Sequence, residues 1–392
     1  MMDWQTVEDQ CFKDNKFFSQ LVGIWPDQER VTKFVRRLVI LVLVIIAIIT
    51  EVSRIILFYS VDALLDQILY LDIGIGILIK QYNYILNEEK LKELLNNIVT
   101  DHLVKRSKEE QEILDTYSKR AMLFSFIYKV SICSSALMFI LIPAVPPILN
   151  VIAPRNESRG REFIYPAYYF MDEQKYYYPI LAHMISIALI LAAVYTACDT
   201  NLIYIIQHGC ALFTISGYRF KHAMDDVNLC DEKYNDVSMY KTYVKVRESI
   251  EAHKKAVEYV EKVNACHLYY FLIVLGFTIV AFTTTFVRLS ETEIGIRFFT
   301  LWGFTVAQLV HLFFLTIMGQ FMVNSNEEIF QTIYEAKWYN GSSKMQSLFV
   351  LVLRKCLNPP AITGGGLVPL NLDTFVQILK ASFSYYTMFR PT

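Results

Sequence analysis

Long apolar stretches alternate with charged stretches along the whole chain. A helix needs about 20 mostly apolar residues to cross a bilayer, and residues 38–58 meet this requirement with a run of leucine, isoleucine and valine. Six further stretches have a suitable length and composition: 61–82, 121–142, 179–206, 267–287, 298–323 and 367–389. The second and the seventh are the least apolar. The pattern predicts an all-α membrane protein with seven transmembrane helices.

Basic residues gather in alternate connecting segments. Four crowd residues 30–37, directly before the first apolar stretch, seven lie between the second and third, and nine lie between the fourth and fifth. Only four lie between the third and fourth, and two between the fifth and sixth. Because Lys and Arg stay on the cytoplasmic side, we expect a cytoplasmic N-terminus and, after seven crossings, an extracellular C-terminus. This is the reverse of a G-protein-coupled receptor.

Two glycosylation sequons test this orientation. Asn156 begins an Asn-Glu-Ser sequon in the 143–178 loop, which the charge pattern places outside. We therefore expect Asn156 to be a glycosylation site. The second sequon begins at Asn340, falls on the predicted inside, and is interpreted as a turn.

The segments predicted to be cytoplasmic have helical periodicity. Apolar residues recur at helical spacing among Lys and Glu in two of them, at Leu91, Leu94, Leu95 and Ile98 and at Tyr243, Val246, Ile250, Val257 and Val260. A third such region, 327–353, carries apolar surface that needs a partner. We expect three parts: 1–323 with six spans, an anchor for subunit assembly at 324–366, and a pore-lining seventh helix at 367–392.

Composition agrees with a membrane protein and argues against other classes. Hydrophobic residues make up 54% of the 392 residues and charged residues 19%, with a net charge of −1. A nucleic-acid-binding protein would be clearly basic. The seven cysteines lack the close spacing of zinc sites, and no phosphate-binding loop, nucleophile elbow or dinucleotide fingerprint occurs. We expect no enzyme activity, no cofactor and no metal.

The last sixty residues carry the most recognisable pattern. It runs from Ile333-Tyr334-Glu335-Ala336-Lys337-Trp338-Tyr339 through Arg354, Pro359-Pro360 and Ile362-Thr363-Gly364-Gly365-Gly366 to Lys380-Ala381-Ser382-Phe383-Ser384-Tyr385-Tyr386. This stretch resembles the insect odorant-receptor family. Over the rest of the chain, the predicted topology and the length also agree with that family. The three glycines are interpreted as a flexible joint before the last span.

The resemblance implies a function. Members of this family form ligand-gated non-selective cation channels, as tetramers of a tuning subunit with a shared co-receptor. The co-receptor has a long insertion between spans four and five. That segment is only about sixty residues long here, so the chain resembles a tuning subunit in the plasma membrane of olfactory sensory neuron dendrites. A gustatory-type receptor channel is the nearest alternative, although its Thr-Tyr…Gln-Phe motif is absent. A metabotropic G-protein-coupled receptor is a more distant one.

The seventh span has two unlike faces. Helical spacing places small or polar residues on one stripe, at Thr374, Gln377, Ala381, Ser384, Met388 and Thr392. The opposite face is mainly aromatic and aliphatic. A polar stripe suits a pore-facing side because polar groups that face lipid are costly, although a buried helix–helix contact also favours small residues. By the resemblance, Met388 and Thr392 match the family's gate positions, and Thr392 is more polar than the usual gate residue.

The resemblance also implies an odorant site in the outer half of spans two to six, although no motif marks it. Residues on inward faces at that depth are the candidates, with ordinary core packing as the alternative for each: Asp66, Leu69, Tyr70, Ile73, Ser134, Ser135, Met138, His183, Met184, Ile187, Phe282 and Trp302. For His183, a hydrogen-bonded core or loop-edge histidine is a better explanation than a ligand contact. This largely apolar set, with aromatic and sulfur-bearing members, predicts a small, volatile, mostly apolar ligand.

Overall fold

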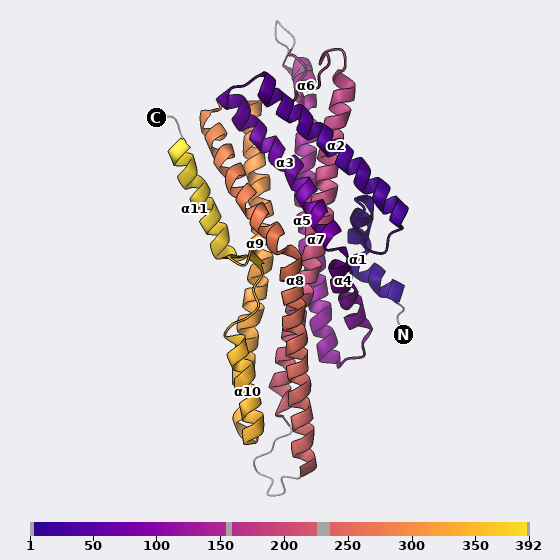
Figure 1. Cartoon of the computed structure of the whole chain (residues 1–392), viewed down its shortest axis with the longest axis vertical. Helices are drawn as coiled ribbons and strands as arrows, with labels where there is room; N and C mark the ends of the chain where they lie inside the picture. Colours follow the sequence, from indigo (N-terminus) through magenta and orange to yellow (C-terminus); the bar gives the residue numbers. More distant parts are fainter. Residues whose placement is uncertain (1–3, 154–158, 226–235, 390–392) are drawn as a thin grey trace.

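The computed structural model describes residues 4–153, 159–225 and 236–389, which form one elongated helical bundle (Figure 1). Its first helices are α1 (Trp4–Leu21), α2 (Arg30–Leu57), α3 (Val61–Leu86), α4 (Glu88–Leu103), α5 (Lys108–Leu141), η1 (Ile142–Ala144) and α6 (Val145–Ile152). The later helices are α7 (Tyr177–Ala223), α8 (Asp236–Glu291), α9 (Ile296–Glu335), η2 (Trp338–Asn340), α10 (Ser343–Cys356) and α11 (Leu372–Phe389). Two short antiparallel strands, β1 (Thr363–Gly364) and β2 (Val368–Pro369), precede α11.

Every predicted span falls on a helix. Among the described residues, five helical segments are long and apolar enough to cross a membrane: Arg30–Leu57, Lys108–Ile152, Tyr177–Ala223, Ser238–Glu291 and Ile296–Asn340. The two that do not meet this requirement, α3 and α11, correspond to the second and seventh predicted spans. These were also the two least apolar stretches in the sequence.

Helix α7 is the centre of the bundle. It packs against α5, α8 and α9 and also contacts α1, α2, α3 and α4. Its side chains are buried in a nearly unbroken run from 192 to 213, which explains why this stretch has no clean amphipathic pattern. A helix that is apolar on all sides is one that other helices surround.

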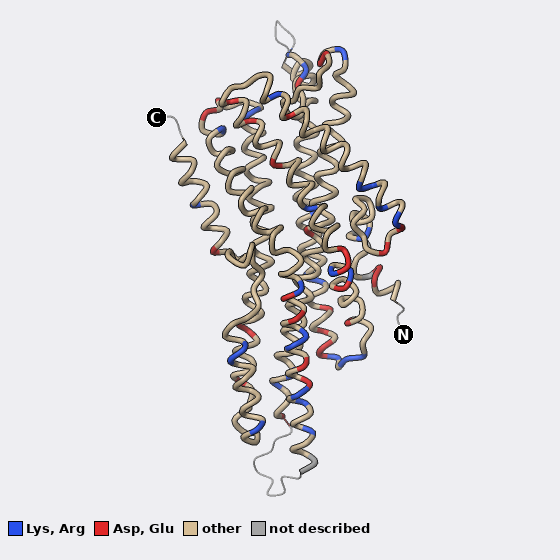
Figure 2. Tube along the Cα trace, in the orientation of Figure 1, with Lys and Arg blue, Asp and Glu red and all other residues tan. Residues whose placement is uncertain are grey.

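Parts of α7, α8 and α9 extend beyond the bundle together with α10, at its lower end in Figure 1. We call this extension the stalk: residues 207–223 of α7, 238–266 of α8, 324–335 of α9, and α10. Figure 2 shows charged residues crowded on the lower part of α8 and on α4, and few in the middle of the upper bundle. The predicted amphipathic helices are confirmed, since Leu91, Leu94, Val246 and Val260 are buried.

Two connecting segments differ from the sequence-based expectation. The 143–178 segment was expected to be a loop, but it begins with η1 and α6, whose prolines lie in the first helical turns, where proline is tolerated. The seventh helix begins at Leu372 rather than at residue 367. Its start is fixed by Asn371, whose Oδ1 accepts a hydrogen bond from the Thr374 N–H at 2.9 Å.

The glycine segment before α11 is an ordered turn rather than the flexible joint that we expected. Gly365 and Gly366 have φ values of +64° and +73°, which favour glycine. The Gly365 N–H donates to the Leu268 carbonyl of α8 at 2.8 Å. A side chain at Gly319 of α9 would collide with the Leu370 carbonyl. The turn is therefore held between α8 and α9 and sets where α11 leaves the bundle.

Candidate ligand-binding cavity

A cavity of about 160 Å³ lies in the upper bundle between α2, α3, α5, α7, α8 and α9. Most of its wall is apolar, including Ile73, Ile132, Ile187, Leu191 and Val274. An engineered apolar cavity of about 150 Å³ holds one benzene molecule. This cavity therefore has room for a ligand built around a single ring.

One wall of the cavity is aromatic. The rings of Tyr70 on α3 and Tyr165 stack with centroids 5.4 Å apart, and Phe304 of α9 lies edge-on to Tyr70 at 6.2 Å. Phe139 of α5 meets Phe304 at 5.6 Å. These contacts join four chain segments around a single ring cluster.

Tyr165 comes from the extended segment between α6 and α7, which two hydrogen bonds hold against the bundle. The Tyr168 N–H donates to the Thr50 carbonyl at 3.0 Å, and the Gln67 amide Nε2 donates to the Pro166 carbonyl at 2.9 Å. Since α2 and α3 both contribute, this segment closes the cavity on the side facing those helices.

A buried ion pair lies at the lower edge of the cavity. The Lys80 ammonium of α3 donates to Asp199 Oδ1 of α7 at 2.5 Å and to the Tyr270 hydroxyl of α8 at 2.7 Å. It also lies 4.3 Å from the ring centroid of Tyr195, which lines the cavity. The Tyr128 hydroxyl of α5 donates to the other oxygen of Asp199. Four helices therefore meet at one paired charge.

The turns at the upper end are joined by a second group of charges. Arg288 of α8 donates to Asp66 at 2.8 Å and to Asp62 at 2.6 Å, and it also bonds Glu291 at 2.9 Å. Arg297 of α9 bonds the second oxygen of Asp66. The upper ends of α3, α8 and α9 are held together by these pairs.

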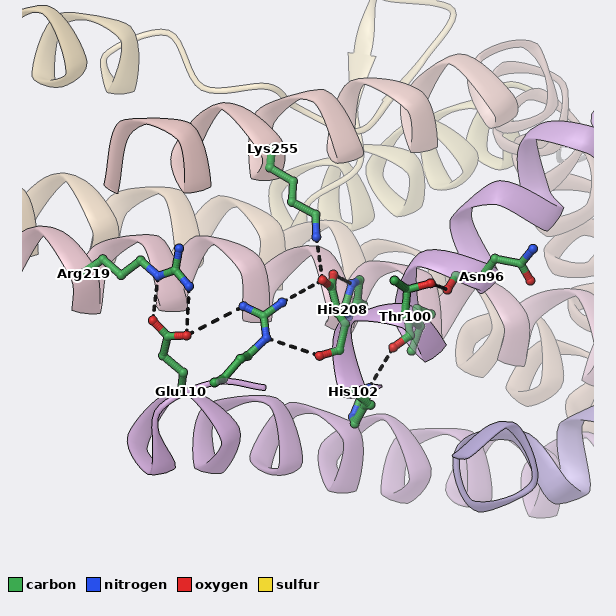
Figure 3. Close-up of polar contacts among 10 residues, drawn as sticks. Asn96, Thr100, His102, Glu110, His208, Arg219 and Lys255 are labelled. Atoms are coloured by element: carbon green, nitrogen blue, oxygen red, sulfur yellow. Dashed lines mark hydrogen bonds and ion pairs between the residues drawn. The ribbon is translucent and has the colours of Figure 1, made fainter. Parts of the chain in front are cut away.

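A third charged network joins the helices below the cavity (Figure 3). Arg219 donates two parallel hydrogen bonds to Glu110, at 2.6 and 2.9 Å. Asp101 of α4 accepts from Arg106 at 2.7 Å, from Lys255 at 2.5 Å and from His208 at 3.0 Å. Burial alone raises the pKa of a carboxyl, but these donors hold the pKa of Asp101 well below its usual value.

A second cavity of about 150 Å³ lies beside this network, between α1, α4, α5 and α7. Its wall includes His102, Asp115, Lys119 and His208. This charged lining suits water rather than an apolar ligand, so the upper cavity is the better candidate for a small apolar molecule.

Five of the predicted odorant-binding residues lie on the wall of the upper cavity: Tyr70, Ile73, Ser135, Met184 and Ile187. They come from α3, α5 and α7. Helical spacing and depth therefore selected at least one inward position on each of these three helices.

Seven predicted residues do not line this cavity, and four of them are engaged elsewhere. Asp66 is held by Arg288 and Arg297. Leu69 packs against Leu301 and Phe304 in a neighbouring cluster. Phe282 is buried against Phe286, at 5.7 Å between ring centroids. The two ring nitrogens of His183 form hydrogen bonds with the Tyr169 hydroxyl at 2.8 Å and with the Leu43 carbonyl at 3.2 Å. His183 therefore matches the alternative given above, a hydrogen-bonded histidine at the edge of a loop.

The other three point out of the bundle. Trp302 is 55% exposed and Met138 is 38% exposed, and Met138 packs across Gly303 of α9. Ser134 is also exposed. Each is about one residue from the inward face of its helix, a rotation that periodicity alone does not fix.

Four wall residues with a carboxyl, amide or imidazole group were not among the candidates: Glu51, Asp72, Gln308 and His311. A sequence signal existed for all of them, since an ionisable or amide side chain inside an apolar span is a candidate for function. Glu51 was overlooked because the first span was not expected to reach the site.

The seventh helix packs through one side. Its buried residues are Thr374, Ile378 and Ser382, and Phe375 and Tyr386 meet aromatic rings of α9 and α8. Of the predicted stripe, Gln377, Ser384 and Met388 are exposed and Ala381 is half-buried. Thr374 departs from the prediction, because its hydroxyl donates to the Pro369 carbonyl at 2.6 Å inside the fold. Thr392 and the sequon residue Asn156 lie outside the described residues.

Residues 60–383 match the family model described as 7tm Odorant receptor. The chain belongs to this odorant-receptor family. Odorant receptor 49a of Drosophila melanogaster is 22% identical over 98 residues, covering 25% of this chain and 24% of that protein. Odorant receptor Or2 of Anopheles gambiae is 20% identical over 149 residues, covering 38% of this chain and 39% of that protein. The chain thus aligns with well under half the length of these relatives.

The fold likeness extends further than the sequence likeness. The insect olfactory receptor OR5 from Machilis hrabei, solved in complex with eugenol, superposes with a TM-score of 0.81 at 15% identity, covering 99% of both chains. A second structure of the same receptor, for which no eugenol is named, superposes with a TM-score of 0.80 at 16% identity. The all-α, seven-helix membrane architecture expected from the sequence is therefore confirmed. The receptor is a multi-pass membrane protein of the odorant-receptor family.

Proposed function

We propose that this receptor is the odorant-binding subunit of a heterotetrameric, ligand-gated, non-selective cation channel that it forms with a co-receptor. The observation that carries the proposal is the aromatic-walled cavity enclosed by six helices of a chain in the odorant-receptor family. The ligand is a small volatile molecule, and its apolar part gains about 0.8 kcal/mol for each methylene that it buries.

The ligand assignment is supported by cavity size and by one relative. A volume of about 160 Å³ matches a single ring with a short substituent. OR5 of Machilis hrabei is the protein solved with eugenol, and we extend to this chain the expectation of a small organic ligand. Tyr70, Ile73, Ser135, Met184 and Ile187 are the contacts that sequence and cavity wall share.

The channel assignment is supported by α11. Gln377, Ala381, Ser384 and Met388 lie on a side of this helix that no other described part of the chain covers fully, whereas Ile378 and Ser382 face the bundle. A pore at the centre of a tetramer requires such a face on each subunit. Met388, which is 69% exposed, would contribute to a hydrophobic constriction that closes by dewetting.

Orientation and assembly follow from charge and from the stalk. Lys and Arg of α4, α5, α8 and the stalk support a cytoplasmic location for that end, with the N-terminus inside and the C-terminus outside. Residues 324–366 would anchor the subunits to one another, because apolar side chains of α10 such as Val350 and Leu351 are exposed. We place the channel in the dendritic plasma membrane of olfactory neurons, with lipid and permeating cations as its other contacts and no nucleic acid.

Current recording tests the proposal. The chain is expressed alone and with a family co-receptor, and both cells receive an odorant panel. The co-expressing cell should respond to at least one odorant with a cation current, and the cell with this chain alone should not. A response of a G-protein reporter without any current would contradict the channel assignment.

A further inference from the structure

Two carboxyl groups line the cavity without any partner among the described residues. Glu51 of α2 and Asp72 of α3 both belong to its wall. Glu51 is only 3% exposed, and its Oε2 is enclosed without a hydrogen-bond partner. Asp72 is half-buried and has no hydrogen bond or ion pair with a described residue. Buried charges are normally paired, so this pair of acids requires an explanation.

The cations near the cavity are already engaged. Lys80 is held by Asp199 and Tyr270, at 2.5 and 2.7 Å. Arg288 and Arg297 are held by the acids of the upper turns. These pairs leave no basic side chain on the cavity wall beyond the imidazole of His311, which lies 3.4 Å from Asp199.

The surrounding rings suit a cation as well. Tyr70, Tyr165, Phe139 and Phe304 form the aromatic wall, and a cation within about 6 Å of a ring face is attracted by the ring quadrupole. Gln308 of α9 has an enclosed Nε2 without a partner, which can donate to a ligand oxygen or π face. A carboxylate beside an aromatic cluster is a favourable arrangement for a protonated amine.

We infer that the preferred ligand of this cavity is a small arylalkylamine, whose ammonium group pairs with Glu51 while its ring lies among the aromatic residues. This inference rests on the proposed role of the cavity as the odorant site, and it narrows the ligand from any small apolar molecule to one with a basic nitrogen. Alkylamines carry a proton at neutral pH, as the lysine side chain does.

Direct binding to the purified full chain in lipid nanodiscs tests this inference without requiring a channel. Benzylamine, benzyl alcohol and toluene share one ring, and their affinities are measured by calorimetry at neutral pH. Benzylamine should bind at least about tenfold more tightly than either neutral compound, since loss of one partner from a buried charged pair costs that much or more. Equal or tighter binding of benzyl alcohol overturns the inference.

Four variants locate the effect. Glu51→Gln should weaken benzylamine at least about tenfold and leave toluene within about threefold. Asp72→Asn, at the other carboxyl of the cavity wall, should weaken benzylamine less than Glu51→Gln does. Glu293→Gln is the matched control, because Glu293 is exposed on the turn between α8 and α9, and it should bind both compounds as wild type does. Unchanged benzylamine affinity in Glu51→Gln overturns the inference.

Glu51→Asp covers the case in which Glu51→Gln fails to fold and binds neither compound. This variant keeps the charge and must still prefer benzylamine to toluene, and loss of that preference contradicts the inference. Binding without any odorant-evoked current in the presence of co-receptor would sink the channel proposal and leave the amine assignment intact.

Discussion

Replacing Lys80 by methionine should destabilise the receptor strongly. Lys80 is only 1% exposed, and its ammonium is shared by Asp199, Tyr270 and the ring of Tyr195. Methionine keeps most of the side-chain volume and removes the charge. Asp199 is then left buried without its cationic partner, although the Tyr128 hydroxyl still donates to it.

The expected loss follows from the burial of the pair. Removing one partner of a buried ion pair typically costs about 3–5 kcal/mol. The remaining donors to Asp199 reduce this cost, so we expect about 3 kcal/mol. That is a large part of the roughly 5–15 kcal/mol by which folded proteins are stable. The double variant Lys80→Met/Asp199→Leu removes both charges and should recover at least half of the loss, because paired charges and apolar residues of similar volume are often nearly equivalent in a core.

Thermal stability in detergent, followed by size-exclusion chromatography of the fluorescently tagged chain, measures this effect. Lys92→Met is the matched control, because Lys92 forms a half-exposed pair with Asp27 at 2.7 Å and such pairs contribute about 0–1 kcal/mol. The reasoning is refuted if the Lys80→Met receptor is as stable as the Lys92→Met receptor. It is also refuted if the losses of stability measured for Lys80→Met and for Asp199→Leu simply add in the double variant.

Three further predictions concern the stalk, the turn before α11 and the pore. Burial lowers the pKa of His253 to about 4, and the unfolded imidazole takes up a proton below about pH 6.5, so stability should fall by about 1 kcal/mol between pH 7.5 and 5.5. In melting curves, His253→Phe should make stability less dependent on pH over this range. The same pH dependence in the variant and in the wild type would contradict the role of His253. Gly319→Ala should cost about 1–3 kcal/mol by overpacking against Leu370, whereas Gly276→Ala, with open space around it, should cost nothing; equal melting temperatures would refute the contact. Met388→Ser should raise basal current in the co-expressed channel by wetting the gate, with Phe389→Ser as the control; a leak only in Phe389→Ser would mean that α11 is rotated.

The spans and their inner faces were predictable because lipid imposes a simple requirement. Apolar length identified the strong spans, and even the two weak ones fell on α3 and α11. Periodicity also selected the buried sides of α4 and of the stalk part of α8, where Leu94 and Val246 are enclosed. These features depend on local pattern, which a sequence carries.

The cavity was harder to predict because its wall depends on helix rotation and on a distant segment. Met138 and Trp302 were selected by depth, yet both point outward. Tyr165 reaches the cavity only because hydrogen bonds to α2 and α3 hold its segment in place. Glu51 was missed because nothing in the sequence shows that α2 borders the same space as α9.

Blocking the cavity tests the central claim most directly. Ala136 of α5 lines the cavity, and its neighbour Leu137 is exposed on the outside of the same helix. Each is replaced by phenylalanine, and odorant-evoked current is recorded with the co-receptor at matched surface expression. Ala136→Phe should weaken the most potent odorant at least about tenfold, and Leu137→Phe should respond as wild type does. Unchanged potency in Ala136→Phe would contradict the account, because the odorant would then bind outside this cavity.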